Sequence, residues 1–173
     1  MGDVFGGVEK SKASFDTNYM KQGTYWCLIN RCKRDESRKK REFFAVEMTV
    51  VHLVDVTEKG PRLGEDCSHL FMEGVEGNEG RIKSFMMCAT GCKDEEVNKA
   101  ACEAVCDEKT QPLHGTIVEV ANRLITTKAN KVIVGTSWKR EIAPSELLAV
   151  IDPKVKERFF PGNLLEKLST AAV

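Results

Sequence analysis

The stretch QGTYWCLINRCKRDESRKKREFFAVEMTVVHLV, residues 22–54, decides the fold. It contains two runs rich in aromatic and β-branched residues, 24–32 and 42–54, separated by the strongly basic connection KRDESRKKR over residues 33–41. Runs of this kind on either side of a short polar connection are typical of paired β-strands. The stretch therefore predicts a β-hairpin with a cationic tip.

Side chains along each predicted strand alternate between its two faces. In the first strand, Tyr25, Cys27 and Ile29 share one face and Trp26 and Leu28 share the other, and the pattern leaves open which face is inside. In the second strand, the apolar row that we expect to face the core, opposite Phe43, consists of Phe44, Val46, Met48 and Val50.

Downstream of this hairpin, the sequence predicts a third strand over residues 67–71, helices over about 78–89 and 94–107, and a second hairpin over 115–127 and 131–139. Three strands, a helical insert and two further strands are the element order of an OB-fold, a five-stranded Greek-key barrel. We therefore expect an all-β fold, a five-stranded OB-fold barrel with a helix pair between strands 3 and 4 and short C-terminal helices. The expected boundaries are a flexible arm over 1–21, an OB-fold domain over 22–143 with its helical insert at about 78–108, and a helical extension over 144–173.

The composition bounds the function classes. The 173 residues are 42% hydrophobic and 30% charged, and no apolar run approaches the roughly 18 residues of a membrane helix. The N-terminus lacks the apolar core of a secretory signal, so we expect a cytoplasmic protein. Lys plus Arg equals Asp plus Glu at 26 each, which excludes a simple argument from net charge to a polyanionic partner. The basic residues are nevertheless concentrated over residues 31–41, and acidic residues dominate 94–108.

Several short motifs follow one another in the order of a known family. They are Gly23-Thr24-Tyr25 at the start of the first strand, Ser37-Arg38-Lys39 in the turn, FFAVE at residues 43–47, and the late hairpin 115–128 followed by 132–138. In this pattern the chain resembles phage-encoded single-stranded DNA-binding proteins of the OB-fold type, over about residues 22–141. The C-terminus departs from the resemblance, because LLEKLSTAAV is not the acidic tail by which many such proteins recruit partners.

The resemblance implies sequence-independent binding of single-stranded DNA in phage DNA replication or recombination. It implies no catalysis and no cofactor, a location in the host cytoplasm, and replication or recombination proteins as further partners. The oligomeric state, monomer or dimer, is left open. The alternative is an OB-type protein-interaction module that docks a partner through the basic hairpin and the C-terminal helices, including Phe159 and Phe160.

Candidate binding residues combine positive charge for phosphates with aromatic rings for unstacked bases. The basic candidates of the first hairpin are Lys33, Arg34, Arg38, Lys39, Lys40 and Arg41. The stacking candidates are Trp26, Phe43 and Trp138, and the late hairpin adds Arg123, Lys128, Lys131, Lys139 and Arg140. The competing interpretation is a solvated hairpin tip and aromatic rings that belong to the core.

The seven cysteines are an odd number and argue for reduced thiols. Four of them form two C-x3-C pairs, Cys88, Cys92, Cys102 and Cys106. On two antiparallel helices, Cys88 would oppose Cys106 and Cys92 would oppose Cys102, an arrangement that suits zinc or two disulfides. Buried cysteines are also ordinary small apolar residues, so no metal site is assigned. No nucleotide-binding, metalloprotease or nucleophile motif is present, and we expect no enzyme.

Overall fold

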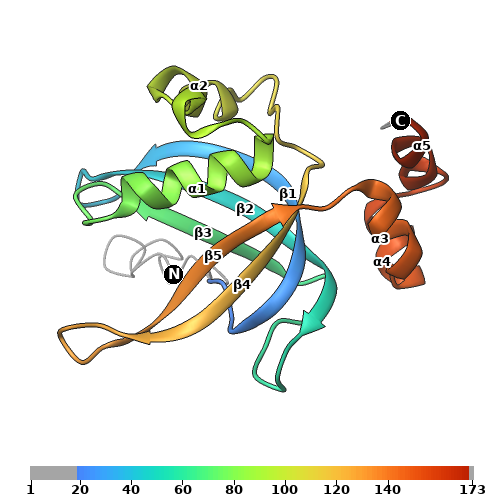
Figure 1. Ribbon diagram of the computed structural model, residues 1–173, viewed down its shortest axis with the longest axis horizontal. Helices are drawn as coiled ribbons and strands as arrows, with labels where there is room; N and C mark the ends of the chain where they lie inside the picture. The colour runs from blue at the N-terminus through green and yellow to red at the C-terminus, as the bar shows by residue number, and fades with distance from the viewer. Residues whose placement is uncertain (1–18, 172–173) are drawn as a thin grey trace, which may run out of the picture.

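The computed structural model describes residues 19–171 (Figure 1). Most of the flexible arm expected over residues 1–21 lies outside the described residues. Its last part does not behave as an arm, because Met20 is 4% exposed and packs in the main core. The ordered fold therefore begins before residue 22.

Five strands form one antiparallel sheet in the order β3-β2-β1-β4-β5. Their bounds are β1 (Gly23–Glu36), β2 (Glu42–Asp55), β3 (Asp66–Met72), β4 (Ile117–Thr126) and β5 (Val132–Glu141). All five predicted strands and both predicted hairpins are confirmed. The sheet is open, since β3 and β5 are its two edges and no ladder joins them.

Five α-helices and one short 3-10 helix accompany the sheet in the described residues. Their bounds are α1 (Asn78–Thr90), η1 (Asp94–Glu96), α2 (Lys99–Val105), α3 (Pro144–Val150), α4 (Pro153–Phe159) and α5 (Leu164–Ala171). The fold is therefore a mixture of strands and helices, and the expectation of an all-β fold is wrong. The helices expected over 144–173 are present as α3, α4 and α5, and they pack against the sheet as part of the fold.

β1 is buried on both faces. Tyr25, Cys27 and Ile29 point into the main core, where they meet the apolar row of β2 that the sequence placed inside. Trp26 and Leu28, on the other face, belong to a second core built with residues of α3, α4 and α5. Burial of both faces explains why the alternation of side chains along β1 left its orientation open.

The C-terminal helices close the second core. Leu147, Val155 and Leu165, one from each of α3, α4 and α5, are buried there together with Phe160. Asp152 caps α4, because its carboxylate accepts the Lys154 N–H at 2.9 Å, and Pro153 occupies the first helical position. Figure 1 shows this helical group on the side of the sheet away from the two hairpin turns.

The helical insert differs from the prediction in its second half. A single helix over residues 94–107 was expected, but the chain forms the 3-10 turn η1 and then the shorter α2. Val97 is extended, and Asn98 caps α2 by accepting the Ala101 N–H at 3.0 Å. An Asn side chain favours a helix start over a helix interior, and it divides the predicted helix here.

The first hairpin is longer than its basic connection suggested. β1 extends to Glu36, so Lys33 and Arg34 lie in the strand, opposite Ala45 and Phe44 of β2. The turn itself spans only residues 37–41. Among the described residues, no helix is long and apolar enough to cross a membrane.

Replacing Leu147 by Ala tests whether the second core stabilises the whole fold. Leu147 is fully buried, so Leu147→Ala is expected to lower the free energy of unfolding by about 2–5 kcal/mol in urea denaturation. The matched control is Leu164→Ala, whose side chain is 42% exposed and should change the stability by less than about 1 kcal/mol. Equal effects of the two substitutions would contradict a structural role for the second core.

Candidate nucleic-acid interface

The two hairpin turns, 37–41 and 127–131, have the same backbone structure. Ser37 N–H donates to the Arg41 carbonyl and Thr127 N–H to the Lys131 carbonyl, both at 2.8 Å. In each turn the hydroxyl of the first residue accepts the N–H of the last, at 3.1 and 3.2 Å. The fourth residue of each, Lys40 or Asn130, has a left-handed φ of 55° or 54°. Both turns project from the same side of the molecule (Figure 1).

Two cations of the first hairpin, Lys33 and Arg34, are paired with carboxylates. Arg34 forms two bonds of 2.7 Å to Glu42 and a third contact of 3.2 Å to Glu103. Lys33 pairs with Glu47 at 2.6 Å, and Arg41 donates to the Glu73 carbonyl. Among the predicted cations of this hairpin, exposed Lys39 and Lys40 form no ion pair with a described residue. Carboxylates therefore reduce the positive charge of the strand part of this hairpin, at Lys33 and Arg34, whereas its turn keeps exposed lysines.

The β4–β5 hairpin is basic in a different way, because no acidic residue occurs between Val120 and Arg140. We call its outer part, residues 122–136, the arm, since it extends beyond the core (Figure 1). Arg123, Lys128 and Lys131 of the arm are exposed, and their side chains form no ion pair with a described residue. In a chain of zero net charge, the arm is a segment of unopposed positive charge.

The arm also exposes aliphatic side chains on both of its faces. The exposed fractions are 56% for Leu124, 48% for Ile125, 64% for Val132 and 46% for Ile133. The register pairs Ile125 with Ile133 on the face that carries Arg123, which we call the outer face of the arm. Leu124 and Val132 lie on the inner face, which continues into the main core through Val134. A paired run of exposed aliphatic residues on a projecting hairpin indicates a contact surface.

A groove of about 380 Å³ lies between the edge of β3 and the base of the arm. Its lining contains no carboxylate and consists of Tyr19, Met20, Ser68, His69, Leu70, Ile133, Val134 and Thr136. Tyr19 is 63% exposed and pairs with Ser68 through a single β-bridge, which fixes an aromatic ring at the rim. The groove therefore combines an exposed ring, an apolar floor and neighbouring unpaired cations.

Trp26 does not provide a stacking surface. Its ring is 8% exposed, its Nε1 donates to Glu119 Oε2 at 2.9 Å, and Arg140 lies 5.9 Å from the ring centre. Arg140 is in turn held by Glu146 at 2.9 Å. The exposure expected for Trp26 is wrong because the C-terminal helices cover that face of β1, and Arg140 has a structural partner.

Trp138 also packs against the main core. Its ring packs 4.8 Å from Phe85 and 5.6 Å from His69, between centroids, and its Nε1 is buried without a hydrogen-bond partner. It is half-buried, as is Phe43, which lies on the outer face of β2 as the sequence predicted. Lys139, next to Trp138, is exposed. The structure thus brings Phe43 and the first-hairpin cations together, and separates them from the arm.

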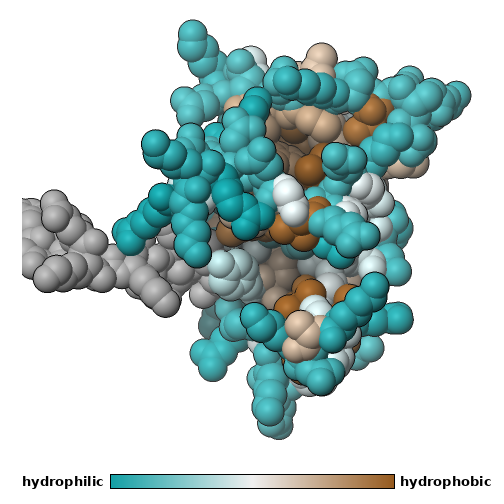
Figure 2. Space-filling view, turned by 90° about the vertical axis from the view of Figure 1, so that its left-hand side faces the viewer, coloured by the Kyte–Doolittle hydropathy of each residue, from teal (hydrophilic) through white to brown (hydrophobic). Residues whose placement is uncertain are grey.

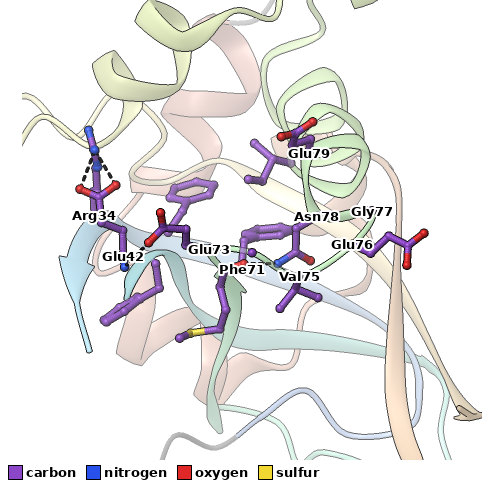
Figure 3. Close-up of a pocket in the computed structure, with 14 residues that line it drawn as sticks. Arg34, Glu42, Phe71, Glu73, Val75, Glu76, Gly77, Asn78 and Glu79 are labelled. Atoms are coloured by element: carbon purple, nitrogen blue, oxygen red, sulfur yellow. Dashed lines mark hydrogen bonds and ion pairs between the residues drawn. The ribbon is translucent and has the colours of Figure 1, made fainter. Parts of the chain in front are cut away.

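A cavity of about 570 Å³ lies between the start of β2, the end of β3 and the start of α1 (Figure 3). Phe43, Phe44 and Phe71 contribute to its floor, but its charged lining is four carboxylates and one guanidinium. These groups are Glu42, Glu73, Glu76, Glu79 and Arg34. Such a surface repels phosphates, so the cavity lies outside any path for a nucleic acid even though it is larger than the groove.

The C-x3-C pairs do not form a four-cysteine site. Burial is the main cause that raises the pKa of Cys88 to about 11, with a smaller contribution from Glu141. Burial likewise raises the pKa of Cys106 to about 11. Burial, with a smaller contribution from Cys106, raises the pKa of Cys32 to about 12. The described residues contain no disulfide and no cluster of metal-ligating side chains, and raised thiol pKa values disfavour the thiolate that zinc requires.

No protein-family model matches the chain, and none of the curated proteins searched is similar to it in sequence. A function must therefore be inferred from the geometry of the groove, the arm and the acidic cavity. Tyr19 is the residue of this site that the sequence analysis missed. Tyr19 lies just before the first strand, in the N-terminal segment 1–21 that the sequence predicted to be flexible. That segment has no regular spacing of apolar residues by which the position could have been found.

His69 predicts a pH dependence of stability. Burial, with a smaller contribution from Arg81, lowers its pKa from 6.5 to about 4. Between these values the unfolded chain binds a proton that the folded chain does not, so lowering the pH reduces the free energy of unfolding, by up to about 3 kcal/mol. His69→Phe is expected to flatten the stability curve between pH 6.5 and 4. Parallel curves for wild type and variant in urea denaturation would contradict this origin.

Proposed function

We propose that this protein binds single-stranded DNA without sequence preference and without catalysis. The observation that carries the proposal is the carboxylate-free groove between β3 and β5, with Tyr19 exposed at its rim and the basic arm beside it. Single strands are held by cations that follow the backbone and by rings on which bases stack. The groove and arm supply both components on one continuous surface.

In this proposal, the tip of the arm binds phosphates, and the groove with the inner face of the arm contacts the bases. Lys128 and Lys131 lie at the tip of the arm, where a phosphate can approach two cations that have no carboxylate nearby in the sequence. Tyr19 and the aliphatic inner face of the arm offer apolar contacts to bases. None of these contacts reads the edge of a particular base, which favours tolerance of sequence. Figure 2 shows this side of the molecule, with hydrophobic hollows surrounded by hydrophilic side chains.

We further infer that the sheet is an OB-fold barrel left open between β3 and β5. The strand order and the position of α1 between β3 and β4 support this inference, since five-stranded OB-folds are partly open barrels. In that fold the loops between strands 1 and 2 and between strands 4 and 5 contact oligonucleotides. A role in phage DNA replication or recombination, in the host cytoplasm and beside replication or recombination proteins, follows from the family resemblance of the sequence.

A partner-docking module is the second candidate function. Leu164 and Leu168 of α5 are 42% and 38% exposed and lie four residues apart, on one side of the helix. Phe160, which the sequence offered for docking, is 3% exposed and belongs to the second core. A partner would therefore meet α5 instead of the Phe159-Phe160 pair. This function predicts no binding of oligonucleotide.

Removing charge from the arm tests the binding surface. Binding of labelled oligo(dT) is measured by fluorescence anisotropy at about 50 and 200 mM salt, with a duplex competitor. Lys128→Ala with Lys131→Ala is expected to weaken binding and to reduce the slope of log K against log salt by about 1.4, because each phosphate contact on a single strand contributes about 0.7. Absence of binding by the wild type at micromolar concentrations would overturn the proposed function.

Two double-lysine variants serve as controls for the arm. Lys39→Ala with Lys40→Ala removes the same charge from the matching turn of the first hairpin, beside the acidic cavity, and is expected to have a smaller effect. Lys154→Ala with Lys167→Ala removes it from exposed positions on α4 and α5, away from the arm, and is expected to have none. A larger loss for the first-hairpin variant than for the arm variant would move the binding site to the first hairpin.

Tyr19→Ala separates stacking from charge. Loss of one base-stacking contact is expected to weaken oligo(dT) binding by about 1–3 kcal/mol and to leave the salt slope unchanged. Tyr19→Phe keeps the ring and should bind within about twofold of the wild type. The same anisotropy titration measures both variants. Unchanged affinity in Tyr19→Ala would show that the exposed ring at the groove rim takes no part in binding.

A further inference from the structure

The four carboxylates of the acidic cavity have no role in the proposed binding of DNA. Figure 3 shows its carboxylates spread from the start of β2, at Glu42, to the first turn of α1, at Glu79. Only Glu42 is matched by a cation of the lining, through its two bonds of 2.7 Å from Arg34. Glu73 accepts the Glu42 backbone N–H at 3.1 Å, which orients its carboxylate without neutralising it.

Glu76 and Glu79 are exposed at the mouth of the cavity. Their side chains form no ion pair with any other described residue. Beneath them, the floor is apolar, with Phe44, Phe71 and Ile82 among its residues. An apolar floor below unpaired carboxylates suits a ligand that is itself apolar and positively charged.

The arm has that chemistry. Its outer face carries Arg123 next to the exposed cross-strand pair Ile125 and Ile133, and its tip carries Lys128 and Lys131. Gly135 lies opposite Arg123, and a Cβ there would stand 2.0 Å from Ile125 Cδ1, so Ile125 lies across the bare backbone of Gly135. This packing holds the isoleucine on the outer face. The sign of the charge prevents two arms from pairing with each other and matches the acidic cavity instead.

We propose that the outer face of the arm docks into the acidic cavity of a second copy of this chain. Arg123 would approach Glu76 and Glu79, and Ile125 and Ile133 would cover the apolar floor. Charge complementarity selects this occupant, because the arm has three cations and no carboxylate whereas the cavity has four carboxylates and one cation. The contact shares Ile133 with the groove, because that side chain lies at the edge of β5 and also lines the groove. The rest of the proposed DNA-binding surface is the inner face of the arm and the remaining groove residues.

The position of the two features favours a closed dimer. The β3–α1 connection, which forms part of the cavity, and the tip of the arm lie on the same side of the molecule (Figure 1). Two copies facing each other across a two-fold axis would therefore make the same contact twice. The expected assembly is a symmetric dimer in place of an open chain of subunits, and it forms without DNA.

A charge exchange between the two surfaces tests the dimer. Sedimentation velocity of the full chain at about 50 mM salt, without DNA, is expected to show a monomer–dimer equilibrium that weakens as salt increases. Glu76→Lys with Glu79→Lys should weaken dimerisation by at least about tenfold, and so should Arg123→Glu. Combining the three substitutions should restore most of the affinity, because the opposed charges are exchanged.

Glu58→Lys with Glu157→Lys is the matched control, since it reverses two exposed carboxylates away from the cavity and should leave the dimer unchanged. A wild type that stays monomeric at about 100 μM would overturn the proposal, as would a dimer that the cavity and arm variants leave intact. Failure of the combined variant to recover affinity would also contradict direct pairing. Because DNA is absent, these results are independent of those for oligo(dT).

Discussion

The burial of β1 on both faces is the constraint on which the rest of the structure depends. β1 is the central strand and pairs with β2 on one side and β4 on the other. One face supplies Tyr25 to the main core, and the other supplies Trp26 to the core under the C-terminal helices. Without α3, α4 and α5, an apolar row of the central strand would face water. The C-terminal helices are therefore part of the sheet's packing, and the opposite side of the molecule remains available for contacts.

Charge context, more than charge content, distinguishes the two hairpins. Their turns share a backbone structure and similar residues, SRKKR and TKANK. The first continues from β1 residues whose charges are paired, since Lys33 binds Glu47 of β2 and Arg34 binds Glu42 of β2 and Glu103 of α2. The second extends away from the core, where no carboxylate is within its own sequence. The positive charge beside the first turn is thus partly neutralised, whereas the arm itself contains no carboxylate.

The open edge of the sheet gives the molecule its groove. His69 of β3 and Trp138 of β5 pack edge to face, and Phe85 of α1 lies against Trp138, so side chains occupy the space between the two edge strands. Beyond Trp138 the arm leaves the core, and Tyr19 and Met20 enter between the edges. The aromatic residues inside this region stabilise the fold and leave Tyr19 as the ring at the surface. The proposed binding surface and the proposed dimer contact then use largely opposite faces of one arm and meet at Ile133.

The sequence by itself determined the five strands, both turns, α1 and the apolar row of β2 that enters the core. These features depend on side-chain period, turn residues and caps, which act within a few residues. Only the tertiary structure decided which rings are covered and which cations are neutralised. Arg34 meets Glu103 across 69 residues, and Trp26 donates to Glu119 across 93 residues, and no local pattern encodes such partners. The observed fold class differs from the predicted all-β class for the same reason. The C-terminal helices bury the second face of the central strand, and no local pattern showed that contact.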